Sequence, residues 1–183
     1  MGEADVHKAL EKLVRTLDAY RIPYAIIGAM ALNEFGYRRT TVDVDVLLTA
    51  DGLATFKRNV LGRGYAEKFP GSRSVRDTEY GIDIDIVLAG SYPGDGKPKP
   101  IAFPDPEKTA ERGARVALLP LPRLLELKLA SGMTAPDRLR DLADVQELIR
   151  LLGLPETVAA DLDASVRDKY LELWRAVLHA REP

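Results

Sequence analysis

The chain opens with a helical pattern of hydrophobic and polar residues, followed by a short apolar run. Four apolar side chains recur at the spacing of one helix face: Leu10, Leu13, Val14 and Leu17. This spacing predicts an amphipathic helix from about Asp5 to Tyr20. Tyr24–Ile27 then predicts a short buried strand, Gly28 a turn, and the next residues a short helix that ends near Gly36. We therefore expect the order helix, strand, glycine turn and helix at the start of the chain.

Alternating hydrophobic and polar positions predict two further strands of similar character. Val42–Thr49 and Gly81–Leu88 each alternate valine or isoleucine with aspartate, a period that is typical of strands with one buried face. Ser72–Asp77 is a third candidate strand. After the first of these strands a helical pattern runs to about Leu61, and Asp51 is the predicted cap of that helix.

A segment rich in proline and glycine follows the aspartate-bearing strands. Residues 89–106 predict a loop longer than compact domains usually contain, so we expect it to be mobile or functional. Beyond a last candidate strand at Arg115–Leu119, the pattern is helical to the end, and Gly132 is expected to end the first of three helices. The sequence therefore predicts an α/β part over residues 1–119 and a helical part over residues 120–183 that packs on it.

Composition narrows the kind of protein. Hydrophobic residues make up 46% of the 183 residues and charged residues 30%, which is usual for a globular protein. Because the formal net charge is only -2, any nucleic-acid partner must be held by a local surface. The absence of cysteine excludes disulfides, thiolate catalysis and cysteine-ligated zinc. No signal-peptide pattern and no window of about 18 apolar residues occur, so we expect a cytoplasmic protein without a membrane segment.

The two alternating strands each carry a pair of aspartates. Because side chains alternate across a strand, Asp43 and Asp45 share one face, and Asp83 and Asp85 share one face of the later strand. If the strands are neighbours, these carboxylates converge, and their repulsion then favours the binding of a cation or of protons. With oxygen ligands alone, the expected ion is Mg²⁺ or Mn²⁺. The alternative is that each strand simply turns an acidic face to solvent.

The arrangement of these motifs resembles a known family. A strand, Gly28 and a short helix precede the motif R-x-T-x-D-x-D at Arg39–Asp45, and a later strand carries an acid followed by the apolar run IVLAG. A second block, LLELKLASGMTAPDRLRDLADVQELI, resembles a helical motif of the same family. Together they resemble the nucleotidyltransferase fold of the DNA polymerase beta superfamily. The chain is most similar to small bacterial nucleotidyltransferase-like proteins that include abortive-infection toxins. The resemblance implies an α+β fold of two layers, with a mixed β-sheet flanked by helices.

The resemblance assigns roles to the acids. Asp43 and Asp45 match the paired metal ligands, and Asp85 matches the third acid, which deprotonates or orients the attacking hydroxyl. Asp85 is preferred because the apolar run follows it directly. Asp83 has the same strand parity and remains a candidate for the third acid and for metal binding.

The resemblance also implies a nucleotide site. Gly28 matches the glycine of the phosphate-holding turn, and Ala29 stands where the family usually has glycine or serine. Arg39 and Thr41 match the residues that precede the paired acids. Two further nucleotide-binding candidates come from the helical block: Lys128, expected at the phosphates and counted with the catalytic residues, and Asp141. Without the resemblance, Lys128 could extend along an apolar helix, and Asp141 and Asp144 could form a solvated face.

The function implied by the resemblance is transfer of a nucleoside monophosphate from an NTP to a hydroxyl group, with Mg²⁺ or Mn²⁺ as cofactor. In the toxin-like branch the acceptors include transfer RNA and proteins, and an antitoxin partner is a further implication. One alternative is a catalytically degenerate member of the fold that binds nucleotide or a partner, which the Gly28–Ala29 turn favours. Another is a small-molecule transferase of the antibiotic-modifying kind.

Overall fold

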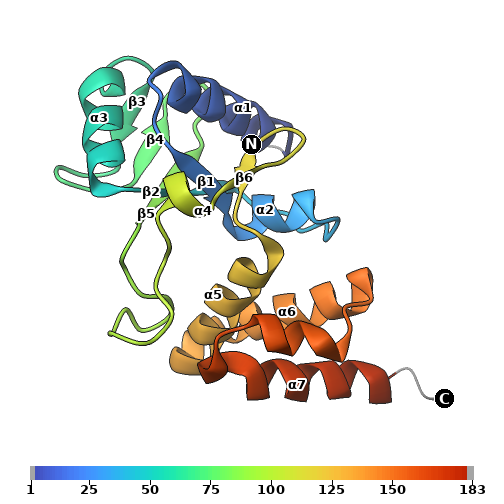
Figure 1. The fold of residues 1–183 in the computed structure, drawn as a ribbon. Coiled ribbons are helices and arrows are strands. Elements are labelled where there is room, and N and C mark those ends of the chain that lie inside the picture. Colours follow the sequence, from blue (N-terminus) through green and yellow to red (C-terminus); the bar gives the residue numbers. More distant parts are fainter. Residues whose placement is uncertain (1–2, 181–183) are drawn as a thin grey trace. The chain divides into compact units, whose positions relative to one another are not determined.

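The computed structural model describes residues 3–180, which form two compact units (Figure 1). The first unit comprises the described residues up to Ala89 together with Pro104–Leu119. The second comprises Gly90–Phe103 and the described residues from Pro120 onward. Every strand of the described residues lies in the first unit, and the second unit is helical apart from its loops.

The first unit is a mixed sheet with helices. Its elements are α1 (Glu3–Ala19), β1 (Tyr24–Ile27), α2 (Gly28–Glu34), β2 (Asp43–Leu48), α3 (Ala50–Val60), β3 (Tyr65–Glu67), β4 (Val75–Asp77), β5 (Asp83–Leu88), α4 (Pro106–Thr109), β6 (Glu111–Arg112) and β7 (Ala117–Leu118). The described strands form one sheet in the order β3-β4-β5-β2-β1-β7-β6. β2 runs parallel to β5 and antiparallel to β1, and β1 runs parallel to β7. This confirms the α+β class and the mixed sheet.

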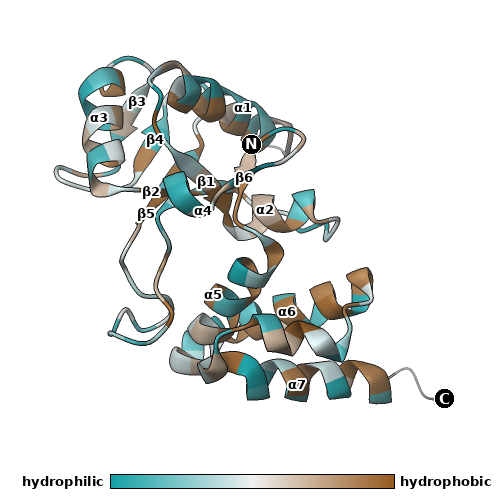
Figure 2. Cartoon of the chain, viewed as in Figure 1, coloured by the Kyte–Doolittle hydropathy of each residue, from teal (hydrophilic) through white to brown (hydrophobic). Residues whose placement is uncertain are grey.

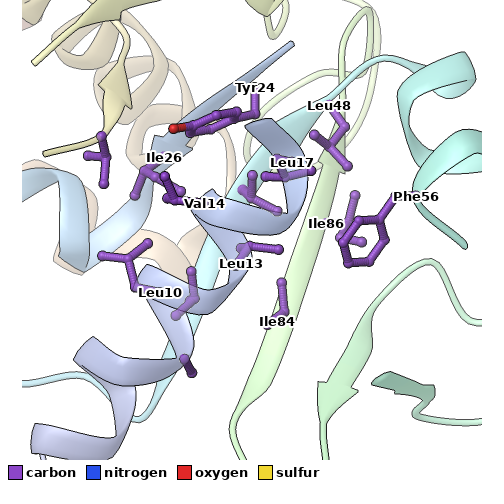
Figure 3. Packing of buried hydrophobic residues seen from close by; sticks show 14 of the residues in the cluster. Leu10, Leu13, Val14, Leu17, Tyr24, Ile26, Leu48, Phe56, Ile84 and Ile86 are labelled. Carbon is purple, nitrogen blue, oxygen red and sulfur yellow. The ribbon is translucent and has the colours of Figure 1, made fainter. Parts of the chain in front are cut away.

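One face of the sheet holds the hydrophobic core of the first unit. Figure 3 shows Leu13 and Leu17 of α1 beside Ile84 and Ile86 of β5, with Phe56 of α3 in the same cluster. All five side chains are buried. The predicted amphipathic pattern places hydrophobic residues on one side of α1 and hydrophilic residues on the other (Figure 2). Since burial of one such side chain contributes about 1.5–3 kcal/mol, this face fixes the register of β2 and β5.

The second unit contains three longer helices. They are α5 (Leu121–Thr134), α6 (Leu139–Leu152) and α7 (Ala164–His179), with short 3-10 turns at η1 (Pro136–Arg138) and η2 (Glu156–Asp161). Within this unit the loop at Gly90–Phe103 is anchored to α5. Lys99 Nζ donates to Pro93 O at 2.6 Å and to Thr134 Oγ1 at 3.0 Å. No helix of the described residues is long and apolar enough to cross a membrane.

Two predicted helix boundaries are wrong. The hydroxyl of Thr49, and not Asp51, caps α3 by accepting from Gly52 N at 3.0 Å, while Asp51 lies in the first turn. Gly132 does not end α5, which continues to Thr134. A Cβ at Gly132 would lie 2.6 Å from Leu142 Cγ, so this glycine allows α6 to approach α5 closely.

The two candidate caps of α3 predict different responses to mutation. Thr49→Ala should lower the free energy of unfolding by about 1–2 kcal/mol, because Gly52 N loses its acceptor. Asp51→Ala should change it by less than about 0.5 kcal/mol, since the better helix propensity of alanine offsets the lost charge near the helix start. Urea unfolding measures both, with Thr49→Ser as the control that keeps the hydroxyl. Equal losses for Thr49→Ala and Asp51→Ala would contradict this assignment.

Candidate active site

Four carboxylates gather on the face of the sheet opposite the core. β2 and β5 are parallel neighbours, and the register pairs are Asp43 with Asp83 and Asp45 with Asp85. The intervening residues, among them Val44 and Ile84, point into the core and are fully buried. All four aspartates are only partly buried. The alternation that was read from the sequence therefore brings the predicted acids into one row of side chains.

Asp45 packs closely against the backbone of Gly28. In the β1–β2 ladder Ile27 lies opposite Asp45, so the chain turns into α2 directly beside this carboxylate. Gly28 has a φ of 65°, and a Cβ built on it would lie 1.9 Å from Asp45 Oδ2. Only glycine satisfies both the backbone conformation and this approach. Ala29, the next residue, is buried at 4% exposure.

The segment before β2 is held by side-chain hydrogen bonds. Thr41 Oγ1 donates to Asp43 Oδ1 at 2.6 Å and thereby orients this carboxylate. Asn33 of α2 accepts from Arg39 N at 2.6 Å and donates from Nδ2 to Arg39 O at 3.2 Å. Asn33 thus holds the backbone at Arg39, and Thr41 contacts the first of the paired acids.

Two basic side chains face the acids of β5. Arg76 of β4 donates to Asp83 Oδ1 at 2.8 Å. Lys68 Nζ lies 3.1 Å from Asp83 Oδ2 and 3.5 Å from Asp85 Oδ1. Burial tends to raise the pKa of Asp83, but the hydrogen bonds from Lys68 and Arg76 outweigh it and lower that pKa below its usual value. The hydrogen bond to Asp83 raises the pKa of Lys68. Asp83 is therefore an ionised partner of two cations, whereas Asp85 has the longer contact.

The chemistry of the acids fits a hard divalent ion. Asp43, Asp45 and Asp85 offer carboxylate oxygens from adjacent strands, which are the ligands that Mg²⁺ and Mn²⁺ prefer. As these side chains stand, no three His, Cys, Asp or Glu residues between residues 3 and 180 are close enough together to hold an ion. Thr41 holds Asp43, and Lys68 contacts Asp85. Metal binding therefore requires that these carboxylates turn toward a shared ion.

Lys128 and Asp141 meet inside the second unit. Lys128 Nζ donates to Asp141 Oδ1 at 2.9 Å and to Asp144 Oδ2 at 2.7 Å. Ser131 Oγ donates to Asp141 Oδ2 at 2.7 Å. Lys128 is 7% exposed and Asp144 is 1% exposed. The interpretation of Asp144 as part of a solvated face is wrong, because this residue joins α6 to α5 through a buried ion pair.

Several residues of the site had no signal in the sequence. Asn33, Lys68 and Arg76 lie outside the motifs that suggested the acids. Lys68 and Arg76 reach Asp83 only because the short hairpin of β3 and β4 pairs with β5, with Arg76 opposite Asp83 in the register. The local signs of that hairpin are the turn sequence FPGS after Lys68 and the predicted strand Ser72–Asp77, which contains Arg76.

Known structures resemble the whole chain, although no protein-family model matches it and no curated protein sequence matches it significantly. The antibiotic-resistance factor ANT(2'')-Ia, solved in complex with adenylyl-2''-tobramycin, is 12% identical, with a TM-score of 0.56 over 96% of this chain and 98% of that one. An antigenic nucleotidyltransferase-like protein from Paracoccidioides brasiliensis is 18% identical, with a TM-score of 0.54 over 96% and 97% of the two chains.

A third similar structure, JHP933 from Helicobacter pylori, is 15% identical, with a TM-score of 0.53 over 97% of this chain and 90% of that one. At such low identity these likenesses concern the fold. The chain has a nucleotidyltransferase fold, as its sequence motifs predicted.

Proposed function

We propose that the protein is a nucleotidyltransferase that depends on a divalent metal and transfers a nucleoside monophosphate from an NTP to an acceptor hydroxyl. The observation that carries the proposal is the row of Asp43, Asp45 and Asp85 on adjacent strands, with Asp45 packed on Gly28. Nucleotidyl transfer needs an aligned nucleophile and neutralisation of phosphate charge more than it needs covalent chemistry. The fold shared with ANT(2'')-Ia supports the same reaction class.

The acids take separate roles in this proposal. Asp43, Asp45 and Asp85 would hold Mg²⁺ or Mn²⁺, which neutralises phosphate charge when bound. Asp85 accepts the proton of the acceptor hydroxyl, whose oxygen bonds to the α-phosphorus of the NTP while the bond from that phosphorus to the leaving pyrophosphate breaks. Asp83 is less suited to this task, because Lys68 and Arg76 both hold it. Among the described residues, Asp85 forms an ion pair with Lys68 alone, at 3.5 Å, and its side chain is 40% exposed.

The residues predicted to bind nucleotide form three pairs with different roles. Gly28 and Ala29 begin α2, where Ile27 provides no side-chain cap, so the first N–H groups of the helix are suited to phosphate oxygens. Arg39 and Thr41 stand before the acids, and Thr41 sets the orientation of Asp43. For Lys128 and Asp141 we propose a structural role instead, because the Lys128 ammonium group donates to both Asp141 and Asp144 within the second unit.

The acceptor is proposed to be RNA or protein, as in the toxin-like branch, and an antitoxin would then be a partner. A second candidate is a small molecule of the aminoglycoside kind. The specific observation that favours it is the likeness to ANT(2'')-Ia over nearly the full length of both chains. If the Gly28–Ala29 turn instead prevents catalysis, the same face would bind nucleotide without transferring it.

Labelled nucleotides test the proposal directly. Each α-labelled NTP is incubated with the protein, Mg²⁺ or Mn²⁺, and total RNA, cell protein or tobramycin. Label should move to one acceptor class, and Asp85→Asn should slow the transfer about 10²–10⁴-fold because the proton acceptor is lost. Asp45→Asn should abolish metal-dependent transfer. Asp83→Asn is the matched control from the same strand, and we expect it to keep most of the activity.

The outcomes separate the candidates. Transfer to RNA or protein supports the first acceptor class, and transfer to tobramycin supports the second. Nucleotide binding without transfer to any of these acceptors, in wild type and variants alike, would identify a binding protein and contradict the proposed reaction. A loss of activity in Asp83→Asn as large as that in Asp85→Asn would reverse the assignment of the third acid.

A further inference from the structure

Among the residues that the structure describes, Lys68 is the one basic side chain that lies within ion-pair distance of both acids of β5. Its Nζ bridges Asp83 Oδ2 at 3.1 Å and Asp85 Oδ1 at 3.5 Å. Arg76 forms its ion pair with Asp83, at 2.8 Å. Asp85 stands opposite Asp45 in the register, so the ammonium group reaches the edge of the proposed metal site.

The position of Lys68 is set by an anchored hairpin. Lys68 follows β3 directly, and its N–H donates across the hairpin to Ser74 O at 3.5 Å. The turn beyond it closes through Ser72 N and Phe69 O at 2.9 Å. Glu67, the residue before Lys68, is held in turn by α3, because Lys57 Nζ donates to Glu67 Oε1 at 2.7 Å. The lysine is therefore directed over β5 by the strand order β3-β4-β5, with a side chain that is 34% exposed.

We propose that Lys68 is a positioning residue, namely the counter-ion of Asp85 in the metal-free protein, and that it competes with the divalent cation for this carboxylate. The inference rests on the proposed function. An ammonium group and a metal ion require the same carboxylate oxygens, and their positive charges repel each other at close range. Metal binding therefore releases Lys68 from Asp85, while Asp83 keeps the lysine through the shorter contact.

This competition couples metal binding to nucleotide binding. Without nucleotide, the ion must displace Lys68 and then remain near its positive charge. With an NTP present, the triphosphate adds negative charge and further oxygen ligands, so the ion no longer depends on the aspartates alone. The basic residue next to the third acid thus disfavours a metal-loaded site that has no substrate.

Mn²⁺ titration of the full chain, followed by electron paramagnetic resonance of the free ion, tests the inference without any activity measurement. In the absence of nucleotide, Lys68→Met should bind Mn²⁺ roughly 5–10-fold more tightly than wild type, as expected for removal of one positive charge that lies close to a bound divalent ion. Lys68→Arg keeps the charge and should bind as wild type does. Saturating NTP should reduce the difference between Lys68→Met and wild type.

Two further variants provide the controls. Lys108→Met removes the same charge from an exposed lysine of the first unit, whose Nζ lies 3.7 Å from Asp105 Oδ2, and it should leave Mn²⁺ affinity unchanged. Asp45→Asn should remove Mn²⁺ binding with and without NTP. Circular dichroism of each variant in EDTA establishes that it is folded before titration.

The outcomes separate the inference from the proposed function. If Mn²⁺ binding requires Asp45 but Lys68→Met binds no more tightly than wild type without nucleotide, the inference is wrong and the proposed function stands. The same conclusion follows if neither protein binds Mn²⁺ without nucleotide while both bind it with NTP. If Asp45→Asn binds Mn²⁺ as wild type does in the presence of NTP, the proposed metal site is itself wrong, and the inference fails with it.

Discussion

Replacement of Gly28 by alanine is expected to lower the free energy of unfolding by roughly 2–4 kcal/mol, because two costs add at this position. The backbone φ of 65° disfavours any residue with a Cβ. The new Cβ would also meet Asp45 Oδ2 at 1.9 Å, so the carboxylate or the start of α2 must move. Urea unfolding measures the loss, and the displaced Asp45 should weaken Mn²⁺ binding in the same variant.

Gly62→Ala is the matched control for the backbone cost. Gly62 has a φ of 73°, and a Cβ at this position would have no atom within 4 Å. The control should therefore lose only about 1–2 kcal/mol. In the double variant Gly28→Ala with Asp45→Ala, removal of the carboxylate should recover part of the loss, since residues in contact do not contribute additively. Equal losses at Gly28 and Gly62, with additive behaviour of the pair, would contradict close packing of Asp45 on Gly28.

The sheet and its acids could be predicted from the sequence because their signal is local. Alternation at Val42–Thr49 and Gly81–Leu88 marks both the strands and the faces of their side chains. The apolar halves of the two strands require a shared core, and burial of that core fixes the register that pairs Asp45 with Asp85. The local alternation and the tertiary packing favour the same arrangement of these two strands, so the positions of the acids could be predicted from their spacing in the sequence.

The partners of the acids could not be predicted because they depend on non-local pairing. Lys68 and Arg76 meet Asp83 only through the offset between β4 and β5, which no sequence period encodes. The packing role of Gly132 could not be predicted for the same reason. A glycine that allows a neighbouring helix to pack closely and a glycine that ends its own helix look the same in the sequence. The short strands β3 and β6 have too few residues for a period to be visible.

Replacement of Lys128 by methionine should lower the free energy of unfolding by roughly 3–5 kcal/mol, as for the loss of one partner of a buried ion pair. Lys128 and Asp144 are nearly inaccessible to solvent, and their Nζ and Oδ2 atoms lie 2.7 Å apart. Methionine fills a similar volume but leaves the buried carboxylate without this positive charge. Lys169→Met is the control, because Lys169 pairs with the exposed Glu172 of the same unit and should cost less than about 1 kcal/mol.

A compensating variant distinguishes the two roles considered for Lys128. Lys128→Met combined with Asp144→Leu replaces the pair by apolar side chains and should regain most of the stability, because desolvation of two charges offsets much of their attraction. If Lys128 holds α5 against α6, this double variant should also bind NTP nearly as wild type does. If Lys128 instead meets the phosphates, the double variant will be stable yet weak in NTP binding. A Lys128→Met protein that unfolds at the same temperature as wild type but binds NTP poorly would also show that Lys128 contacts the phosphates, as the family resemblance implied.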